Sequence, residues 1–181
     1  MTGLSFSLTP LLVPNIPDLT IQGKILRQNN LITIHYALRG KLEHIFLPSP
    51  AVNPTRNEEL WKTTCFEFFL AVKDSPEYWE FNLSPSGDWN VYRMDAYRRI
   101  GFRKETLIQR LQFETQKDSN GFLLALDVDL NAILRVEQIL EVGITAVIQT
   151  RERSETYGAL VHPAAEPDFH LRESFILAMA G

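Results

Sequence analysis

The sequence predicts an all-β fold, an antiparallel β-sandwich of the jelly-roll type with at most one or two short helices. Short segments in which apolar and polar residues alternate recur along the chain, as they do in half-buried strands. Turn-forming residues separate several of these segments, most clearly at Ser84–Asp88 and Lys117–Gly121. Only Asp129–Leu140 has apolar residues at helical spacing. Many short strands joined by turns are typical of sandwiches.

In the N-terminal part, prolines at both ends of Pro10–Pro17 predict a loop. Residues Ile32–Leu38 alternate with a period of two and predict a strand, and a second strand is expected at Leu42–Leu47. Pro48–Glu59 is rich in proline, asparagine and charge, which favours a loop.

Three strands are predicted in the centre, at Thr64–Val72, Tyr78–Ser84 and Trp89–Met94. Because short turns join them, they are expected to form an antiparallel meander. The side chains expected in the core are Phe66, Phe68, Leu70, Trp79, Phe81 and Leu83.

The C-terminal half repeats this pattern. The expected strands are Leu111–Thr115, Phe122–Val128, Val142–Thr150, Thr156–Val161 and Phe175–Met179. Asp129–Leu140 is the one predicted helix, with Asp129 as its N-cap.

The length of 181 residues predicts one domain over residues 1–181. Hydrophobic residues make up 45% of the chain, which is enough for a core of its own. The single cysteine, Cys65, excludes an internal disulfide, and its place in a strand predicts a small core residue.

The charge balance argues against an electrostatic nucleic-acid partner, because 18 basic and 22 acidic residues give a net charge of −4. Met1–Thr9 has no basic residue ahead of its apolar ones and does not resemble a secretory signal. No apolar run reaches the roughly 18 residues of a membrane span. We therefore expect a cytoplasmic protein without nucleic-acid or membrane partners; the oligomeric state stays open.

A polar face is predicted on the central strands. If the aromatic residues point into the core, Glu67, Glu80 and Asn82 share the opposite, outward face. Two carboxylates on one face repel each other unless a cation or hydrogen bonds compensate. Arg93 on the third strand is the expected cation, since its planar guanidinium can bridge two carboxylates.

The third strand leaves an alternative open. Either Asn90 and Tyr92, or Trp89, Val91 and Arg93, join the polar face, because a slip of one residue exchanges the two sets.

Polar and aromatic groups on one sheet face suit sugars, whose hydroxyls take hydrogen bonds while an aromatic ring packs against the C–H face. The candidate rings are Trp61, Tyr78, Trp89, Tyr92 and Tyr97. The same pattern is also typical of the solvated outer face of an ordinary half-buried sheet.

Two segments resemble the signatures of bacterial DOMON-like proteins related to family 9 carbohydrate-binding modules. These are Leu60–Phe69 and Tyr78–Arg93, continued by Tyr97–Arg98, and Pro167–His170 is similar to a third, shorter signature. The resemblance implies a β-sandwich. Modules of family 9 bind sugars, often at chain ends, and other DOMON relatives bind sugars or haem.

The leading hypothesis is a non-enzymatic protein that binds a small saccharide or another polyhydroxylated molecule, without a cofactor. The expected ligand-binding residues are Trp61, Glu67, Glu80, Asn82, Trp89, Tyr92, Arg93 and Arg98.

Three alternatives remain. An enzyme of glycoside-hydrolase type would use Glu67 and Glu80 as acid and base. A haem protein would draw its axial ligands from Met94, His162 and His170. A metal site would combine His162, Asp168 and His170, although a loop held by prolines, with hydrogen-bonding histidines, explains that segment better.

Overall fold

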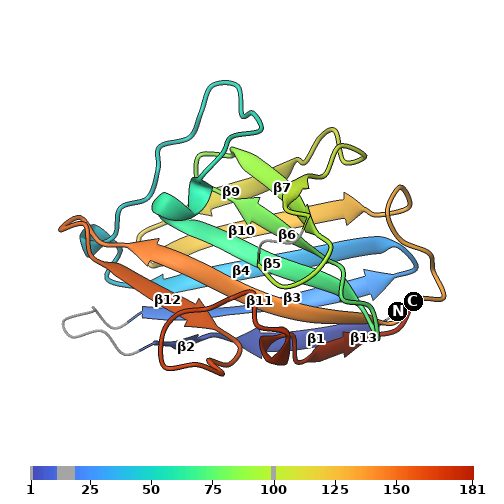
Figure 1. Ribbon diagram of the computed structural model, residues 1–181. Coiled ribbons are helices and arrows are strands. Elements are labelled where there is room, and N and C mark those ends of the chain that lie inside the picture. The colour runs from blue at the N-terminus through green and yellow to red at the C-terminus, as the bar shows by residue number, and fades with distance from the viewer. Residues whose placement is uncertain (1, 12–18, 99–100) are drawn as a thin grey trace.

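The computed structural model describes residues 2–11, 19–98 and 101–181, which form two antiparallel sheets packed face to face (Figure 1). The strands are β1 (Thr2–Ser7), β2 (Thr9–Pro10), β3 (Leu19–Gln28), β4 (Leu31–Gly40), β5 (Cys65–Val72), β6 (Tyr78–Leu83), β7 (Trp89–Met94), β8 (Arg103–Lys104), β9 (Phe113–Lys117), β10 (Gly121–Asp129), β11 (Leu140–Gln149), β12 (Glu155–Ala159) and β13 (Leu177–Met179). The 3-10 helices are η1 (Leu42–His44), η2 (Leu60–Lys62) and η3 (Arg172–Ser174). The predicted all-β sandwich is confirmed.

The strand order places β1, β3 and β4 in one sheet and the central meander in the other. One sheet has the order β1-β3-β4-β10-β9, and the other has β2-β12-β11-β5-β6-β7-β8, with β13 beside β11. The meander β5-β6-β7 is therefore confirmed, and β11 and β12 extend its sheet beyond β5. Long-range pairing thus places Thr145 of β11 beside Glu67 of β5, and Ala159 of β12 on the other side of Thr145.

Between the sheets lies the main core, and it contains every side chain predicted there from the central strands. Phe66, Phe68, Leu70, Trp79, Phe81 and Leu83 are at most 3% exposed. The opposite face of the same sheet is buried as well, in a second apolar cluster. That cluster contains Phe69, Ala71, Tyr78, Tyr92, Met94 and Phe175. The face expected to be outward is therefore covered by the C-terminal segment.

Two predicted elements are wrong, and one lies largely outside the described residues. Residues Leu42–Leu47 form η1 and a single bridge from Ile45 to Thr150 instead of a strand. Asp129–Leu140 contains turns instead of a helix, although Asp129 accepts a hydrogen bond from the backbone N–H of Asn131. In the predicted Pro10–Pro17 loop, positions 12–18 lie outside the described residues.

The buried side chain of Arg27 explains why the predicted helix does not form. Its guanidinium donates to the carbonyl oxygens of Gln138 over 2.6 Å and of Val136 over 3.2 Å. It also donates to the carbonyl of Met179 over 2.8 Å, which joins this segment to β13. The hydrogen bonds to Arg27 hold this segment as turns, and Leu140 at its end pairs, in β11, with Val72 of β5.

A glycine in β11 makes room for the C-terminal segment. A Cβ added at Gly143 would lie 2.7 Å from Cδ1 of Phe175. We expect Gly143→Ala to lower the free energy of unfolding by about 1–3 kcal/mol, because overpacking forces neighbouring atoms to move. Urea denaturation measures the change. Gly158→Ala in β12 is the control, since its Cβ would meet atoms no nearer than 3.4 Å. Equal effects of the two substitutions would contradict this account.

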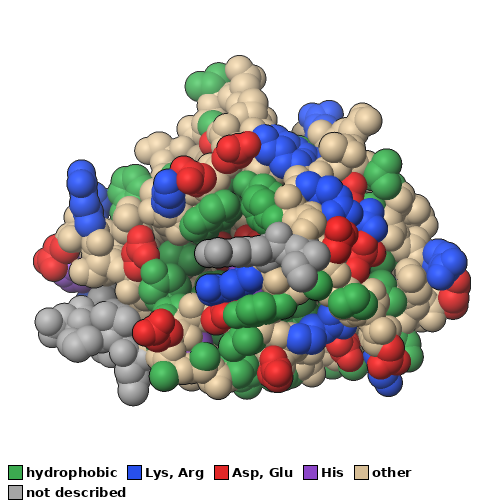
Figure 2. Space-filling view, in the orientation of Figure 1, with side chains coloured by type: hydrophobic (Ala, Val, Ile, Leu, Met, Phe, Trp, Pro, Cys, Tyr) green, Lys and Arg blue, Asp and Glu red, His purple; other side chains and the backbone are tan. Residues whose placement is uncertain are grey.

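On the face shown in Figure 2, acidic and basic side chains are interspersed. Within the part of the chain that the structure describes, the helical segments are 3-10 turns, none long and apolar enough to cross a membrane.

Candidate functional site

The register of the central hairpins settles the alternative that the sequence left open. The Ser84–Asp88 turn is closed by a hydrogen bond from the Ser84 N–H to the Asp88 carbonyl over 2.9 Å. It places Asn90 opposite Asn82 and Tyr92 opposite Glu80. Asn90 and Tyr92 therefore join the polar face.

The same register overturns the predicted role of Arg93. Arg93 lies opposite Trp79, on the side of the sheet that faces the main core. Its guanidinium pairs with the Glu77 carboxylate and lies 5.5 Å from the centre of the Trp79 ring. Trp89 also points to the core side, where the Arg56 guanidinium covers its ring. Neither Arg93 nor Trp89 meets Glu67 or Glu80.

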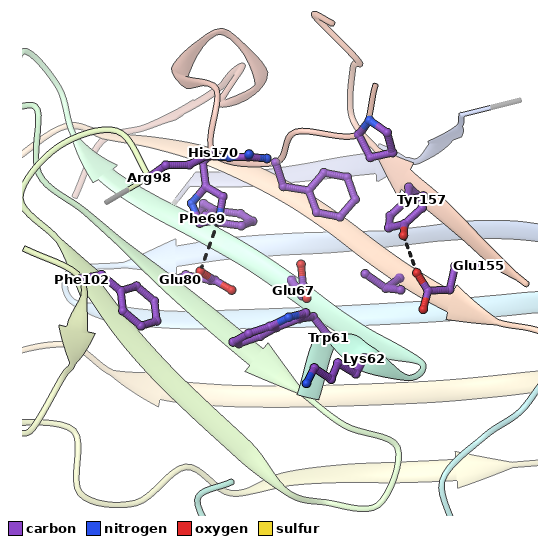
Figure 3. Close-up of a pocket in the computed structure, with 13 residues that line it drawn as sticks. Trp61, Lys62, Glu67, Phe69, Glu80, Arg98, Phe102, Glu155, Tyr157 and His170 are labelled. Carbon is purple, nitrogen blue, oxygen red and sulfur yellow. Dashed lines mark hydrogen bonds and ion pairs between the residues drawn. The ribbon is translucent and has the colours of Figure 1, made fainter. Parts of the chain in front are cut away.

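A cavity of about 320 Å³ opens on the polar face (Figure 3). It lies over β5, β6, β11 and β12, and its remaining walls come from η2, the loop after β7 and the C-terminal segment. The lining residues are Trp61, Lys62, Glu67, Phe69, Glu80, Arg98, Phe102, Val147, Glu155, Tyr157, Pro167, Phe169 and His170.

Two buried carboxyl groups lie at the centre of the cavity. Glu67 is 2% exposed and Glu80 is 5% exposed. The Thr145 hydroxyl donates to Glu67 Oε2 over 3.2 Å, and the Asn82 amide donates to Glu80 Oε1 over 2.8 Å. Glu67 Oε1 and Asn82 Oδ1 are buried without a hydrogen-bond partner among the described residues. Two acceptor atoms in this cluster are therefore unsatisfied, which is costly in a buried site.

Burial controls the ionisation of this pair. It raises the pKa of Glu80 to about 7. Burial, followed by the nearby Glu80 charge, raises the pKa of Glu67 well above its ordinary value. Glu80 consequently holds its proton at mildly acidic pH, where exposed glutamates are ionised, and burial shifts the pKa of Glu67 in the same direction.

His170 lies beside the carboxyl pair. Its Nε2 is 3.9 Å from Glu80 Oε2 (Figure 3). Its Nδ1 is 2.9 Å from the Tyr78 hydroxyl. Burial, and to a lesser extent the charge of Arg98, lower the pKa of His170 to about 4. The imidazole is therefore neutral near neutral pH and supplies no countercharge to Glu80.

Aromatic rings form the cavity wall around the carboxyl groups. Trp61 is presented by η2 and packs edge-on against Tyr92, with ring centres 5.8 Å apart. Phe102 also stacks on Tyr92, with ring centres 4.8 Å apart. In Figure 3 the carboxyl groups of Glu67 and Glu80 lie between the Trp61 ring and the His170 ring. A ligand in the cavity would meet ring faces and carboxyl groups together.

Arg98 and Tyr97 tie the loop after β7 to the C-terminal segment. Arg98 Nε donates to Asp168 Oδ1 over 3.2 Å, and the Tyr97 hydroxyl donates to the other carboxylate oxygen. The Arg98 N–H also donates to the Tyr78 hydroxyl over 3.2 Å. Arg98 thus lines the cavity with its charge already paired.

Of the eight residues predicted to bind a ligand, four line the cavity: Trp61, Glu67, Glu80 and Arg98. Asn82 and Tyr92 lie behind this wall, in contact with Glu80 and Trp61 respectively. The lining residues that sequence reasoning missed as ligand contacts are Lys62, Phe69, Phe102, Val147, Glu155, Tyr157, Pro167, Phe169 and His170. The Pro167–His170 signature contains three of these residues, but the sequence did not show that they line the cavity.

The histidines and the methionine of the metal and haem hypotheses are not brought together. His162 Nε2 meets the carbonyl oxygen of Thr9, whereas His170 lines the cavity. Met94 is buried in the second apolar cluster. Asp168 is engaged by Arg98 and Tyr97. Among the described residues, no group of three or more His, Cys, Asp or Glu side chains is placed to hold a metal ion.

Known proteins resemble the chain in fold more than in sequence. No protein-family model matches it, and no curated protein is detectably similar in sequence. A "putative carbohydrate-binding protein" from Bacteroides uniformis superposes with a TM-score of 0.67 at 13% identity, over 96% of this chain and 84% of that one. A family 9 carbohydrate-binding module from Caldicellulosiruptor kristjanssonii in complex with cellotriose gives a TM-score of 0.50 at 12% identity, over 80% and 67%. At these identities the likeness concerns the fold.

Proposed function

We propose that the protein binds a saccharide in the cavity over β5 and β6, without chemical conversion of the ligand. The observation that carries the proposal is the pairing of buried carboxyl groups, Glu67 and Glu80, with the ring of Trp61 in one cavity. Its volume of about 320 Å³ lies near the lower end of the range for small-molecule sites, which is about 300–1,000 Å³.

The polar groups of the cavity match sugar hydroxyls. A hydroxyl is both a donor and an acceptor, so it can donate to a carboxyl oxygen and accept from a neighbouring group. Glu67 Oε1 lacks a donor in the structure, and a bound hydroxyl would supply one. Satisfying this buried atom removes a desolvation cost, which favours a ligand rich in donors.

The apolar groups match the C–H face of a pyranose ring. Trp61 is half-buried and backed by Tyr92, and Phe102 and Phe169 offer further ring surface. A rigid ring that is already packed loses little entropy when it contacts a ligand.

The likeness of fold supports the same class of ligand by analogy. The module from Caldicellulosiruptor kristjanssonii is a family 9 carbohydrate-binding module seen with cellotriose. A fold alone does not determine a ligand, so the argument rests on the cavity.

We expect Trp61→Ala to weaken saccharide binding by about tenfold or more, because it removes the packed ring against which the sugar would lie. Isothermal titration calorimetry with cellotriose, following a glycan-array screen, measures the affinity. Phe46→Ala removes an aromatic ring that is 39% exposed and lies outside the cavity lining, and it serves as the control. Equal affinity of wild type and Trp61→Ala for every glycan that binds would contradict a site in this cavity.

The glycoside-hydrolase alternative needs a different charge state. Such enzymes pair a protonated acid with an ionised carboxylate. In this cavity burial raises the pKa values of both Glu67 and Glu80. Release of reducing sugar from cello-oligosaccharides, abolished by Glu80→Gln, would favour the enzyme over the binding protein.

A further inference from the structure

Among the residues that the structure describes, the carboxyl pair in the cavity has no closely paired cation. Lys62 lines the cavity, but its Nζ lies 2.6 Å from Glu59 Oε2. Arg98 is paired with Asp168. Among the described lining residues, these two and His170 are the basic groups, and none forms a close ion pair with Glu67 or Glu80.

The remaining contacts of the pair come from neutral groups on every neighbouring strand. Thr145 on β11 donates to Glu67, and Asn82 on β6 donates to Glu80. Tyr92 on β7 lies opposite Glu80 in the register, and the buried thiol of Cys65 on β5 lies near Glu67. The third acidic lining residue, Glu155, accepts a hydrogen bond from Tyr157. Within the described part of the chain, the groups that donate to the pair are therefore neutral.

Two buried polar atoms of the described residues lie at the carboxyl pair without hydrogen-bond partners. Glu67 Oε1 and Asn82 Oδ1 are buried without donors among the described residues, and Glu67 lies directly opposite Asn82 in the register of β5 and β6. Glu67 itself lines the cavity. An ammonium group carries three donors and a positive charge, whereas a hydroxyl carries one donor and no charge.

We propose that the ligand is a saccharide with a free amino group, whose ammonium binds between the carboxyl groups of Glu67 and Glu80. The inference rests on the proposed function and specifies its ligand class. Charge-assisted hydrogen bonds are about twice as strong as neutral ones, so the amino group would dominate the choice among sugars of one shape. N-acetylation of the amine removes its charge and adds bulk, and should remove the preference.

Three trisaccharides with the same β-1,4-linked backbone test the inference by calorimetry at pH 6: the glucosamine trimer, cellotriose and the tri-N-acetyl trimer. We expect the glucosamine trimer to bind at least about tenfold more tightly than the other two. Cellotriose binding as tightly would overturn the inference and leave the proposed function standing. Failure of all three to bind would contradict both.

A simple amine without a sugar tests the cation site separately from the saccharide assignment. If 2-aminoethanol binds as tightly as the glucosamine trimer, the cation site stands and the saccharide assignment falls.

The number of protons released on binding provides a further test that needs no variant. Because burial raises the pKa of Glu80 to about 7, an incoming ammonium should displace a proton at pH 6. Titrations in buffers of different ionisation enthalpy measure this release, and a net uptake of protons on binding would overturn the inference.

Glu67→Gln tests the position of the charge through a ratio of affinities. We expect the preference for the glucosamine trimer over cellotriose to fall to about one- to threefold in this variant. Glu137→Gln, which removes an exposed carboxylate remote from the cavity lining, is the matched control and should keep the wild-type ratio. An unchanged ratio in Glu67→Gln would overturn the assignment.

Discussion

Phe68→Ala is expected to lower the free energy of unfolding by about 3–5 kcal/mol, the usual cost of emptying a buried aromatic site. Phe68 is completely buried between the sheets, and its ring stacks on Phe81 with centres 4.4 Å apart. The cavity left behind would lie in the middle of the core, where the strands of two hydrogen-bonded sheets cannot close around it. Urea denaturation followed by circular dichroism measures the loss.

Phe46→Ala is the matched control, because the same side chain is removed from a position that is 39% exposed. We expect a change below about 1 kcal/mol there. Similar values for the two variants would mean that Phe68 does not face the core.

The central strands were predictable because their alternation is strong. Every second residue of β5 and β6 is a large apolar side chain, and the Ser84–Asp88 turn separates β6 from β7 clearly. In the other sheet, β4 was predicted at Ile32–Leu38, whereas β3 was missed for a local reason. In β3 the inward positions include Gly23 and Arg27, which interrupt the apolar pattern. Gly23 makes room for the Phe6 ring, and Arg27 is satisfied by backbone carbonyls distant in sequence.

The site was predictable in its carboxyl groups and not in its surroundings. Alternation placed Glu67, Glu80 and Asn82 on one face, which the structure confirms. It did not show that this face is covered, because Phe169 and His170 arrive from a segment about 90 residues away in sequence. Arg93 was misplaced because the length of the preceding turn decides its face, and alternation alone leaves that length open.

The covered carboxyl pair makes stability depend on pH in an unusual direction. For Glu80 the pKa rises from an ordinary 4.5 to about 7 on folding, so between these values the folded state holds a proton that the unfolded state has lost. Stability therefore falls as pH rises through this window, and Glu67, whose pKa burial also raises, adds to the fall. A shift of this size corresponds to roughly 3 kcal/mol for Glu80 alone.

The buried His170 changes the pH dependence of stability in the opposite direction at acidic pH. Its pKa is lowered from 6.5 to about 4, so its contribution is complete above pH 6.5 and is lost as pH falls toward 4. Between pH 4.5 and 6.5 the histidine offsets Glu80, and from pH 6.5 to about 7 Glu80 acts without that offset, while Glu67 adds to the fall in the same direction. We therefore expect maximal stability at mildly acidic pH and a decrease toward pH 8.

Denaturation of wild type, Glu80→Gln and Glu137→Gln across pH 5 to 8 tests this expectation. Glutamine keeps the shape of Glu80 and can still accept the hydrogen bond from Asn82, but it carries no charge at any pH. The Glu80→Gln curve should lose part of the decline and lie above wild type at pH 8, by an amount on the order of 1–3 kcal/mol. Glu137→Gln, an exposed site, should run parallel to wild type. If wild-type stability instead rises steadily from pH 5 to 8, the pair must be ionised in the folded protein. The cavity would then hold two negative charges even without a ligand.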